Sequence, residues 1–211
     1  MSYLQSVFKD FAEISTPTII ALAILLVVAL VFYISSRKRA WNARMLVYGA
    51  LCIAIAFTLS YVRIVRFPQG GSITPASMLP VMAFAFMFGP APGLLAGTVY
   101  GLLQLLQDFY VVHPVQLIID YILAFGALGL AGFFRKNFIL GVFTGGFVRL
   151  LCHFVSGMVF FAEYAPPGQP AAIYSLIYNI SVIGPDILIC LAVAMLPQVK
   201  NMMKRLQDSA Q

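Results

Sequence analysis

Charged residues are scarce in this sequence. Only 9% of its 211 residues are Asp, Glu, Lys or Arg, whereas 62% are hydrophobic. An ordinary soluble domain has about 25% charged residues, and one core of this size could not bury so much apolar surface. The scarcity therefore excludes an ordinary soluble fold and favours a protein that spans a membrane.

Several motifs that define enzyme and metal-site classes are also missing. The three cysteines lie apart within apolar segments and lack CxxC or metal-ligand spacing, so they predict packing rather than a metal site: Cys52, Cys152 and Cys190. No GxxxxGK[ST] loop or HExxH motif is present, which argues against ATP hydrolysis by this chain and against a zinc enzyme. We therefore expect no metal and no cofactor.

Long apolar runs are what the sequence has instead. Runs of about 20 residues without strand-like alternation favour transmembrane helices, and seven are predicted, at 17–36, 43–62, 77–89, 92–107, 115–134, 138–161 and 171–196. The third and fourth are short and flank Gly89-Pro90-Ala91-Pro92-Gly93, which predicts a tight turn within one helical hairpin. The expected fold class is an all-α integral membrane protein.

The basic residues predict the orientation in the bilayer. The net charge is +6, but the basic residues gather at the ends of apolar runs rather than in a stripe, which argues against nucleic acid as a partner. Seven crossings place the clusters at 37–44, 135–136 and 200–205 on one side, which the positive-inside rule makes cytoplasmic. The N-terminus is then outside and the tail at 200–211 is cytoplasmic. Arg63 and Arg66, at the outer end of the second segment, are exceptions.

Polar residues inside the apolar segments are the candidates for function, because an ionisable group at the bilayer centre costs at least about 2.5–3.5 kcal/mol. A carboxylate there needs a positive partner, and aromatic faces favour a delocalised cation. The outer halves of the last three segments therefore predict a pocket for a small heteroaromatic cation, formed by Asp120, Tyr121, His153, Gly157, Phe161, Tyr174 and Asn179. The alternative is that Tyr174 and Asn179 are interfacial anchors and that His153 makes an interhelical hydrogen bond.

Two further charges lie deeper. Arg149 is one turn below His153, and Asp186 on the last segment is at comparable depth. Either charge alone would be costly in the membrane, so we predict an interhelical Arg149–Asp186 ion pair beneath the pocket.

Several stretches resemble the thiamine-specific substrate-binding (S) subunits of energy-coupling-factor transporters, the ThiT or YuaJ family. The resemblance covers about residues 43–197. It rests on Arg149-Leu-Leu-Cys-His-Phe-Val-Ser-Gly-Met-Val-Phe-Phe161, Tyr174-Ser-Leu-Ile-Tyr-Asn179, Phe67-Pro-Gln-Gly-Gly-Ser-Ile-Thr74 with Met78-Leu-Pro80, and Gly93-Leu-Leu-Ala-Gly-Thr-Val-Tyr-Gly-Leu-Leu-Gln104.

The resemblance implies a six-helix bundle at 42–199 that captures thiamine from outside the cell membrane without being an enzyme. It implies docking on a transmembrane coupling subunit and two ATPase subunits. The segment within 1–41 is then one extra N-terminal transmembrane helix, followed by a basic linker.

The resemblance also assigns roles to residues. Tyr110 joins the binding residues named above. The loop Gln69-Gly70-Gly71-Ser72 acts as a lid, where the alternative is an ordinary exposed loop. Ala50 and Ala54 contact the coupling subunit, although helix packing within this chain explains their spacing equally well.

There are two departures from the family pattern. Asp120 is one methylene shorter than the family's Glu, and Phe161 replaces a Trp that can stack on the ligand.

Other functions stay open on the sequence alone. One alternative is an S subunit for another vitamin or for a thiamine precursor. Another is an intramembrane enzyme that uses His153 and Asp120 as acid and base. A self-sufficient secondary transporter is a third, although no internal repeat is apparent.

Overall fold

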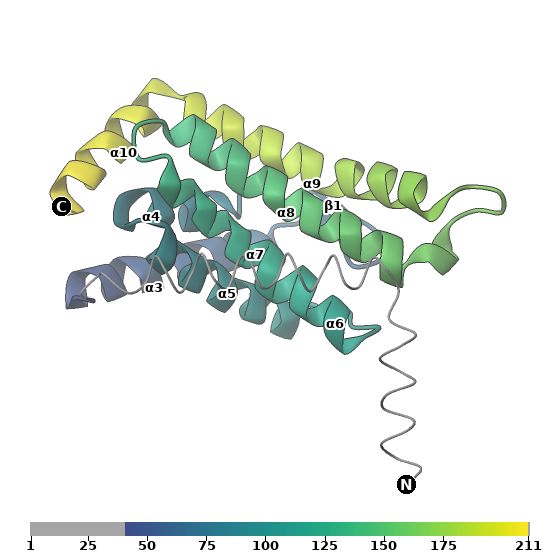
Figure 1. Ribbon diagram of the computed structural model, residues 1–211. Helices are drawn as coiled ribbons and strands as arrows, with labels where there is room; N and C mark the ends of the chain where they lie inside the picture. The colour runs from purple at the N-terminus through teal and green to yellow at the C-terminus, as the bar shows by residue number, and fades with distance from the viewer. Residues whose placement is uncertain (1–40, 211) are drawn as a thin grey trace, which may run out of the picture.

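A computed structural model of the protein describes residues 41–210. The predicted first helix at 17–36 lies outside these residues. The described helices run side by side, with the C-terminal helix α10 at one end of the bundle and the 161–170 connection at the other (Figure 1). The predicted all-α membrane fold is confirmed.

The bundle contains the six predicted segments of the region 42–199, each within two residues of its expected ends. They are α3 (Ala43–Tyr61), α4 (Leu79–Phe88), α5 (Pro90–Gln107), the composite helix from Pro114 to Phe133, α8 (Phe138–Phe160) and α9 (Ala171–Met195). A two-residue antiparallel pair, β1 (Val65–Arg66) with β2 (Ser72–Ile73), lies between α3 and α4. A short 3₁₀ turn, η3 (Ala162–Tyr164), follows α8.

Helix ends coincide with capping residues in the sequence. Asn42 begins α3 by accepting a hydrogen bond from the backbone of Met45, and Asn137 begins α8 by accepting one from Leu140. Gly89 alone separates α4 from α5 and has a φ of 96°, a conformation that favours glycine. The predicted tight turn of the α4–α5 hairpin is confirmed.

The helix α4 crosses only half of a bilayer. Its 10 residues span about 15 Å at 1.5 Å per residue, against a hydrocarbon core about 30 Å thick. The preceding segment makes up the difference, because β2 packs against α9 and Thr74 bonds to Asp186 in the middle of that helix. Non-helical backbone at this depth is tolerated where it is buried in protein or lines a cavity.

The fifth predicted segment is less regular than expected. It consists of α6 (Pro114–Leu117), the π-helix η1 (Ile118–Leu123), α7 (Ala124–Gly126) and the 3₁₀-helix η2 (Ala127–Phe133). Gly93, Gly97 and Gly101 of α5 face its backbone so closely that an added Cβ would overlap it. These glycines therefore let α5 pack closely against the composite helix.

The tail predicted at 200–211 is mostly helical. Helix α10 (Pro197–Ala210) buries Met203 and Gln207, and the Gln207 amide donates to the carbonyl of Phe86 on α4. Arg44 of α3 donates to the carbonyl of Ser209. This amphipathic helix therefore closes the basic end of the bundle.

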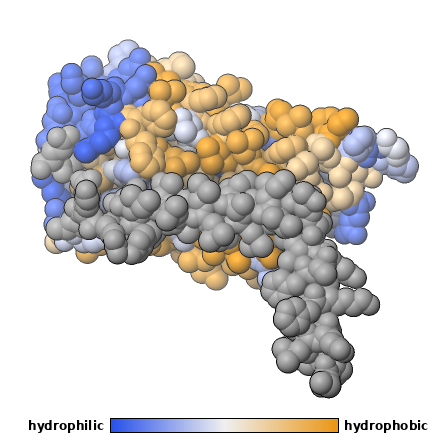
Figure 2. All heavy atoms as spheres, viewed as in Figure 1, coloured by the Kyte–Doolittle hydropathy of each residue, from blue (hydrophilic) through white to orange (hydrophobic). Residues whose placement is uncertain are grey.

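The surface fits a membrane protein. Four of the described helices are long and apolar enough to cross a bilayer, namely α3, the composite helix 114–133, α8 and α9. Figure 2 shows apolar residues along the middle of the visible face and hydrophilic residues at its ends, with the larger hydrophilic cluster at the end that holds α10.

Candidate functional site: a cavity opposite the basic end

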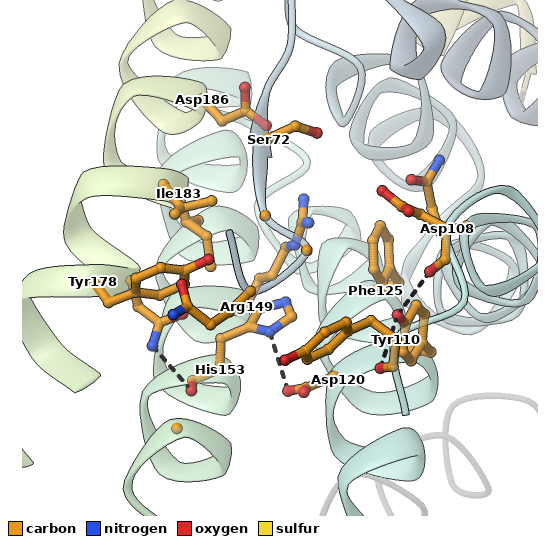
Figure 3. Close-up of a pocket in the computed structure, with 18 of the residues that line it drawn as sticks. Ser72, Asp108, Tyr110, Asp120, Phe125, Arg149, His153, Tyr178, Ile183 and Asp186 are labelled. Carbon is orange, nitrogen blue, oxygen red and sulfur yellow. Dashed lines mark hydrogen bonds and ion pairs between the residues drawn. The ribbon is translucent and has the colours of Figure 1, made fainter. Parts of the chain in front are cut away.

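One cavity brings the predicted binding residues together. It lies on the half of the bundle away from α10, between α5, the composite helix, α8, α9 and the β1–β2 hairpin (Figure 3). Its lining includes every predicted binding and lid residue: Gln69, Gly70, Gly71, Ser72, Tyr110, Asp120, Tyr121, His153, Gly157, Phe161, Tyr174 and Asn179.

Asp120 and His153 face each other across the cavity (Figure 3). His153 Nδ1 lies 3.1 Å from Asp120 Oδ1, and the Gln116 amide donates to Asp120 Oδ2 at 2.6 Å. Asp120 is only 7% exposed, so its carboxylate depends on these neighbours and on whatever occupies the cavity. Gln116, one helical turn earlier, holds the shorter Asp side chain in place.

Asn179 is positioned by the contact between α8 and α9. Its amide nitrogen donates to the carbonyls of His153 and Ser175. A Cβ on Gly157 would overlap the hydroxyl of Ser175 and lie 3.1 Å from the Asn179 amide nitrogen. The glycine therefore permits close contact between α8 and α9 at this point.

Aromatic side chains line the outer part of the cavity. Tyr110 and Phe161 stack with ring centres 6.0 Å apart, and the Tyr110 and Tyr164 hydroxyls share a hydrogen bond of 3.2 Å. This bond, together with burial, raises the pKa of Tyr110 to about 12. The tyrosine is therefore neutral at physiological pH and can donate a hydrogen bond.

The predicted lid residues form the tip of the β1–β2 hairpin. Gly70 has a φ of 89° and lies against the Tyr110 ring, so this position favours glycine. Gly71 lies against Val182, where an added Cβ would be 2.7 Å from the valine Cγ1. Residues 69–72 line the cavity rather than projecting from the surface, which contradicts the alternative of an ordinary exposed loop.

The predicted ion pair between Arg149 and Asp186 is wrong, because each residue has another partner. Among the described ion pairs none joins these two residues. Asp186 Oδ1 instead accepts from the Thr74 backbone at 2.7 Å, and the Thr74 hydroxyl also donates to this carboxylate. The Arg149 guanidinium carbon lies 4.2 Å from the centre of the Phe125 ring. Thr74, in the segment between β2 and α4, therefore supplies the hydrogen bonds of the Asp186 carboxylate, which the sequence had predicted to pair with Arg149.

Apart from Asp120 Oδ1, which pairs with His153, three buried polar atoms around the cavity have no hydrogen-bond partner among the described residues. They are His153 Nε2, Arg149 Nε and the Tyr178 hydroxyl. Each belongs to a residue that lines the cavity. Unpaired buried polar groups are costly, so these atoms are available to a polar ligand.

Other lining residues were not predicted. Gln116 and Ser175 lie one turn before Asp120 and Asn179 on the same helix faces, so polar residues at i, i+4 in an apolar segment were a usable signal. Asp108 also lines the cavity, where it lies 3.2 Å from Arg63 and 3.0 Å from Arg66. No local pattern in the sequence points to this contact.

The predicted docking stripe lies on the surface. Ala50 and Ala54 of α3 are exposed, as is Thr58, whose hydroxyl donates to the carbonyl of Ala54. Large apolar side chains beside them, among them Leu51 and Ile55, are also more than half exposed. Packing of these alanines within the described bundle is therefore contradicted.

No group of three or more His, Cys, Asp or Glu side chains within residues 41–210 is placed to hold a metal ion. The expectation that the site needs no cofactor stays a prediction.

Comparisons with known proteins give consistent results. The sequence model of the family described as thiamine transporter protein (Thia_YuaJ) matches residues 46–206. The thiamine transporter ThiT of Bacillus subtilis is 37% identical over 140 residues, which are 58% of this chain and 72% of the relative. The ThiT of Lacticaseibacillus paracasei is 29% identical over 154 residues, which are 62% of this chain and 74% of the relative.

A solved structure shares the fold. ThiT from Listeria monocytogenes superposes with a TM-score of 0.68 at 26% sequence identity, covering 79% of this chain and 99% of the other. The six-helix bundle thus has a counterpart in a related chain.

Proposed function

The chain belongs to the thiamine transporter (Thia_YuaJ) family, and from this premise we propose how it captures its ligand. Its function is thiamine uptake by the membrane-embedded substrate-binding subunit of a transporter. We propose that thiamine occupies the cavity of Figure 3. The observation that supports this most is the placement of Asp120, a nearly buried carboxylate, beside aromatic side chains and unpaired polar atoms.

Each part of thiamine has a chemically matched surface. The aminopyrimidine has hydrogen-bond donors and acceptors on its edge, which suit Asp120, His153 and Asn179. The thiazolium is a delocalised cation, which suits the faces of Tyr110 and Phe161. In this proposal Tyr121 and Tyr174 complete the wall, and Gly157 acts by positioning Asn179.

A binding measurement tests the site. The purified chain is expected to bind thiamine with a submicromolar Kd by calorimetry. Asn179→Ala removes the amide that bridges α8 and α9, and Asp120→Ala removes the buried carboxylate, so each should weaken binding at least about tenfold, the effect of one charge-assisted hydrogen bond. Ser181→Ala is the control, since Ser181 is exposed on α9. Tight binding of an uncharged vitamin without thiamine binding would contradict the proposal.

Uptake also needs an energy source and a direction. We propose that the basic end with α10 faces the cytoplasm, so that the cavity opens outward. We further propose that the exposed Ala50–Ala54 stripe docks on the transmembrane coupling subunit of an energy-coupling-factor transporter with two ATPase subunits. Small residues let helices approach closely, which supports this surface as the contact.

The docking proposal predicts that a variant on α3 can still bind thiamine but no longer support its uptake. Ala54→Trp should leave the Kd for thiamine unchanged, because the side chain faces away from the cavity, but should abolish thiamine uptake in cells. Leu188→Trp is the matched control, since Leu188 on α9 is 67% exposed and belongs to no small-residue stripe. Equal uptake by the two variants would contradict docking through α3.

The Asp120–His153 pair also supports an acid–base enzyme as a second candidate. We propose that the pair only binds, because His153 Nε2 has no nucleophile within hydrogen-bond reach among the described residues. Thiamine should be recovered unchanged after prolonged incubation with the chain, as checked by mass spectrometry. A ligand-derived product that disappears in His153→Gln would favour the enzyme.

A further inference from the structure

The C-terminal helix α10 lies across the basic end of the bundle. It does not continue the line of α9, because Leu196 between the two helices is extended, with a ψ of 131°, and α10 then packs against α4 (Figure 1). The Gln207 amide donates to the Phe86 carbonyl at 3.3 Å. Arg44 of α3 donates to the Ser209 carbonyl at 2.7 Å. These contacts fix one face of α10 and leave the opposite face uncovered by the described chain.

Trp41 places α10 at the level of the lipid headgroups. It is the only tryptophan of the chain, lies just before α3 and is 43% exposed. Tryptophan is enriched at membrane–water interfaces, where its amphipathic ring lies among the headgroups. Arg44, one turn later, is the residue that bonds to the end of α10. The helix therefore lies at the interface, next to the bilayer surface.

The uncovered face of α10 is positively charged. Lys200, Lys204 and Arg205, which we call the basic face of α10, are all exposed. None of them forms an ion pair or a side-chain hydrogen bond with a described residue. Asp208 is the only acidic residue of the helix, so three bases and one acid leave it with a net charge of +2. The hydrophilic cluster at this end in Figure 2 thus contains charges that no described residue neutralises.

Apolar side chains lie close to the basic face. Met202 on α10 is 49% exposed, and Met195 and Leu196 just before the helix are 52% and 49% exposed. These side chains are unfavourable in water but are accepted at the boundary between headgroups and acyl chains. The stems of Lys and Arg cover apolar surface while their charges reach the headgroups. Basic and apolar residues on one interfacial helix are typical of contact with anionic lipids.

Membrane topology alone does not require the basic face. Arg135 and Lys136, in the connection between η2 and α8, already place positive charge at this end, as does Arg44, and the positive-inside rule counts such residues near the helix ends. The basic face adds three unpaired charges to a helix whose other face is docked. A leaflet that contains anionic lipids would supply the missing negative charge.

We propose that the basic face of α10 binds the headgroups of anionic phospholipids. Lys200, Lys204 and Arg205 contact the phosphates, and Met202 and Leu196 lie against the upper part of the acyl chains. The bound lipid holds α10 at the membrane surface and reinforces its contacts with α4 and α3. The proposal requires only that the chain spans a membrane, so it does not depend on thiamine in the cavity.

Trp41 serves as the reporter, because a brominated lipid quenches the fluorescence of a tryptophan that it contacts. The full chain is reconstituted in phosphatidylcholine vesicles that contain increasing amounts of brominated phosphatidylglycerol or brominated phosphatidylcholine. Each basic residue near an anionic surface contributes about fivefold in affinity. We expect the unmodified chain to prefer phosphatidylglycerol about tenfold or more, and Lys200→Gln/Lys204→Gln/Arg205→Gln to lower this preference at least about fivefold.

The matched control keeps the charge and changes the side chains. Lys200→Arg/Lys204→Arg/Arg205→Lys should retain the preference for phosphatidylglycerol, because all three positions stay positive. Arg66→Gln removes one charge at the opposite end, where this side chain is 63% exposed, and should leave quenching of Trp41 unchanged. Raising the salt concentration should weaken the preference, because salt screens exposed charges.

Thermal unfolding in detergent gives a second readout. All variants should unfold at the temperature of the unmodified chain in neutral detergent, because the substituted side chains of α10 are exposed and unpaired. Added phosphatidylglycerol should raise the melting temperature of the unmodified chain and of the charge-keeping control, since a ligand of the folded state stabilises it. The glutamine variant should gain less.

The lipid assignment is overturned if the unmodified chain shows no preference for phosphatidylglycerol, or if the glutamine variant keeps the full preference. If the preference is absent and the glutamine variant nevertheless loses thiamine uptake in cells, the basic face contacts another protein subunit, which also overturns the assignment. Failure of the unmodified chain to bind thiamine would refute the proposed function and leave the lipid result unaffected.

Discussion

At the scale of single residues, Gly157 sets how closely α8 and α9 approach beside the cavity. Its Cα faces Ser175, whose hydroxyl donates to the Phe154 carbonyl at 2.7 Å, and Asn179, which bonds across to α8. The small residue at this contact therefore positions the Asn179 amide beside the cavity through packing.

Gly157→Ala should consequently disturb both stability and binding. The added methyl group would overlap Ser175 and push Asn179 away, and overpacking of this kind costs about 1–3 kcal/mol. We expect a lower melting temperature in detergent and a weaker Kd for thiamine. Gly184→Ala is the control, because its Cβ would meet Ile180 at an ordinary 3.7 Å. Equal melting temperatures for the two variants would contradict this role of Gly157.

At the scale of elements, the re-entrant β1–β2 hairpin is held by one face of α9. Tyr178 stacks edge-on with Phe67, Val182 contacts Gly71, and Asp186 accepts from Thr74. These α9 residues are spaced i, i+4 and i+8, so they form one helix face. Because the hairpin tip lines the cavity, this face links α9 to the cavity wall.

Asp186 should therefore be coupled to Thr74 and only weakly to Arg149. Asp186→Asn removes charge-assisted hydrogen bonds, so the apparent stability should fall and labelled thiamine should dissociate faster. In a double-mutant cycle, Asp186→Asn and Thr74→Val should be non-additive by about 0.5–3 kcal/mol. Asp186→Asn with Arg149→Gln should be closer to additive. Full rescue of Asp186→Asn by Arg149→Gln would instead support a direct ion pair between Arg149 and Asp186.

The helix α10 is the second element with a definite structural role. Met203 is 2% exposed and packs in the main core, whereas its neighbour Met202 is 49% exposed. Met203→Ala should lower stability by about 2–5 kcal/mol, the cost of truncating a buried Met. Met202→Ala should change it by about 0.5 kcal/mol or less, as exposed positions do. Thermal unfolding of the two variants measures the difference, and equal curves would show that α10 does not dock.

At the scale of the whole molecule, most of the described basic residues lie at one end of the bundle and the cavity lies at the other. Described basic residues at the α10 end are Arg44, Arg135, Lys136, Lys200, Lys204 and Arg205. The cavity is lined from the other end by the hairpin and by the connections around Tyr110 and Phe161. The positive-inside rule therefore supports the proposal that the cavity opens outward.

Cysteine accessibility tests this orientation. Glu163→Cys lies beside the cavity end and Asp208→Cys on α10, and both positions are exposed. A membrane-impermeant maleimide on intact cells should label the first variant, and the second only after permeabilisation. The native cysteines are buried or half-buried, so the unmodified chain serves as the background control. Labelling of Asp208→Cys alone in intact cells would reverse the orientation.

Most of the membrane topology follows from local sequence. Apolar runs set the helix bounds within two residues, because length and hydrophobicity are properties of each segment alone. Helical periodicity places His153, Gly157 and Phe161 on one face, and depth from the helix ends brings Asp120 and Asn179 to the same level. Local sequence therefore predicted the lining residues on the last three segments, whereas Tyr110 and the hairpin tip at 69–72 were expected only from the family resemblance.

The partners of these residues were decided only by the tertiary structure. Asp186 bonds to Thr74 rather than Arg149 because the segment before α4 re-enters the bundle, and no pattern within that segment encodes its destination. Asp108 meets Arg63 and Arg66 for the same reason, since these residues are more than 40 positions apart. Hydrophobicity and periodicity act within one helix, whereas hydrogen bonds and ion pairs form between segments that only packing brings together.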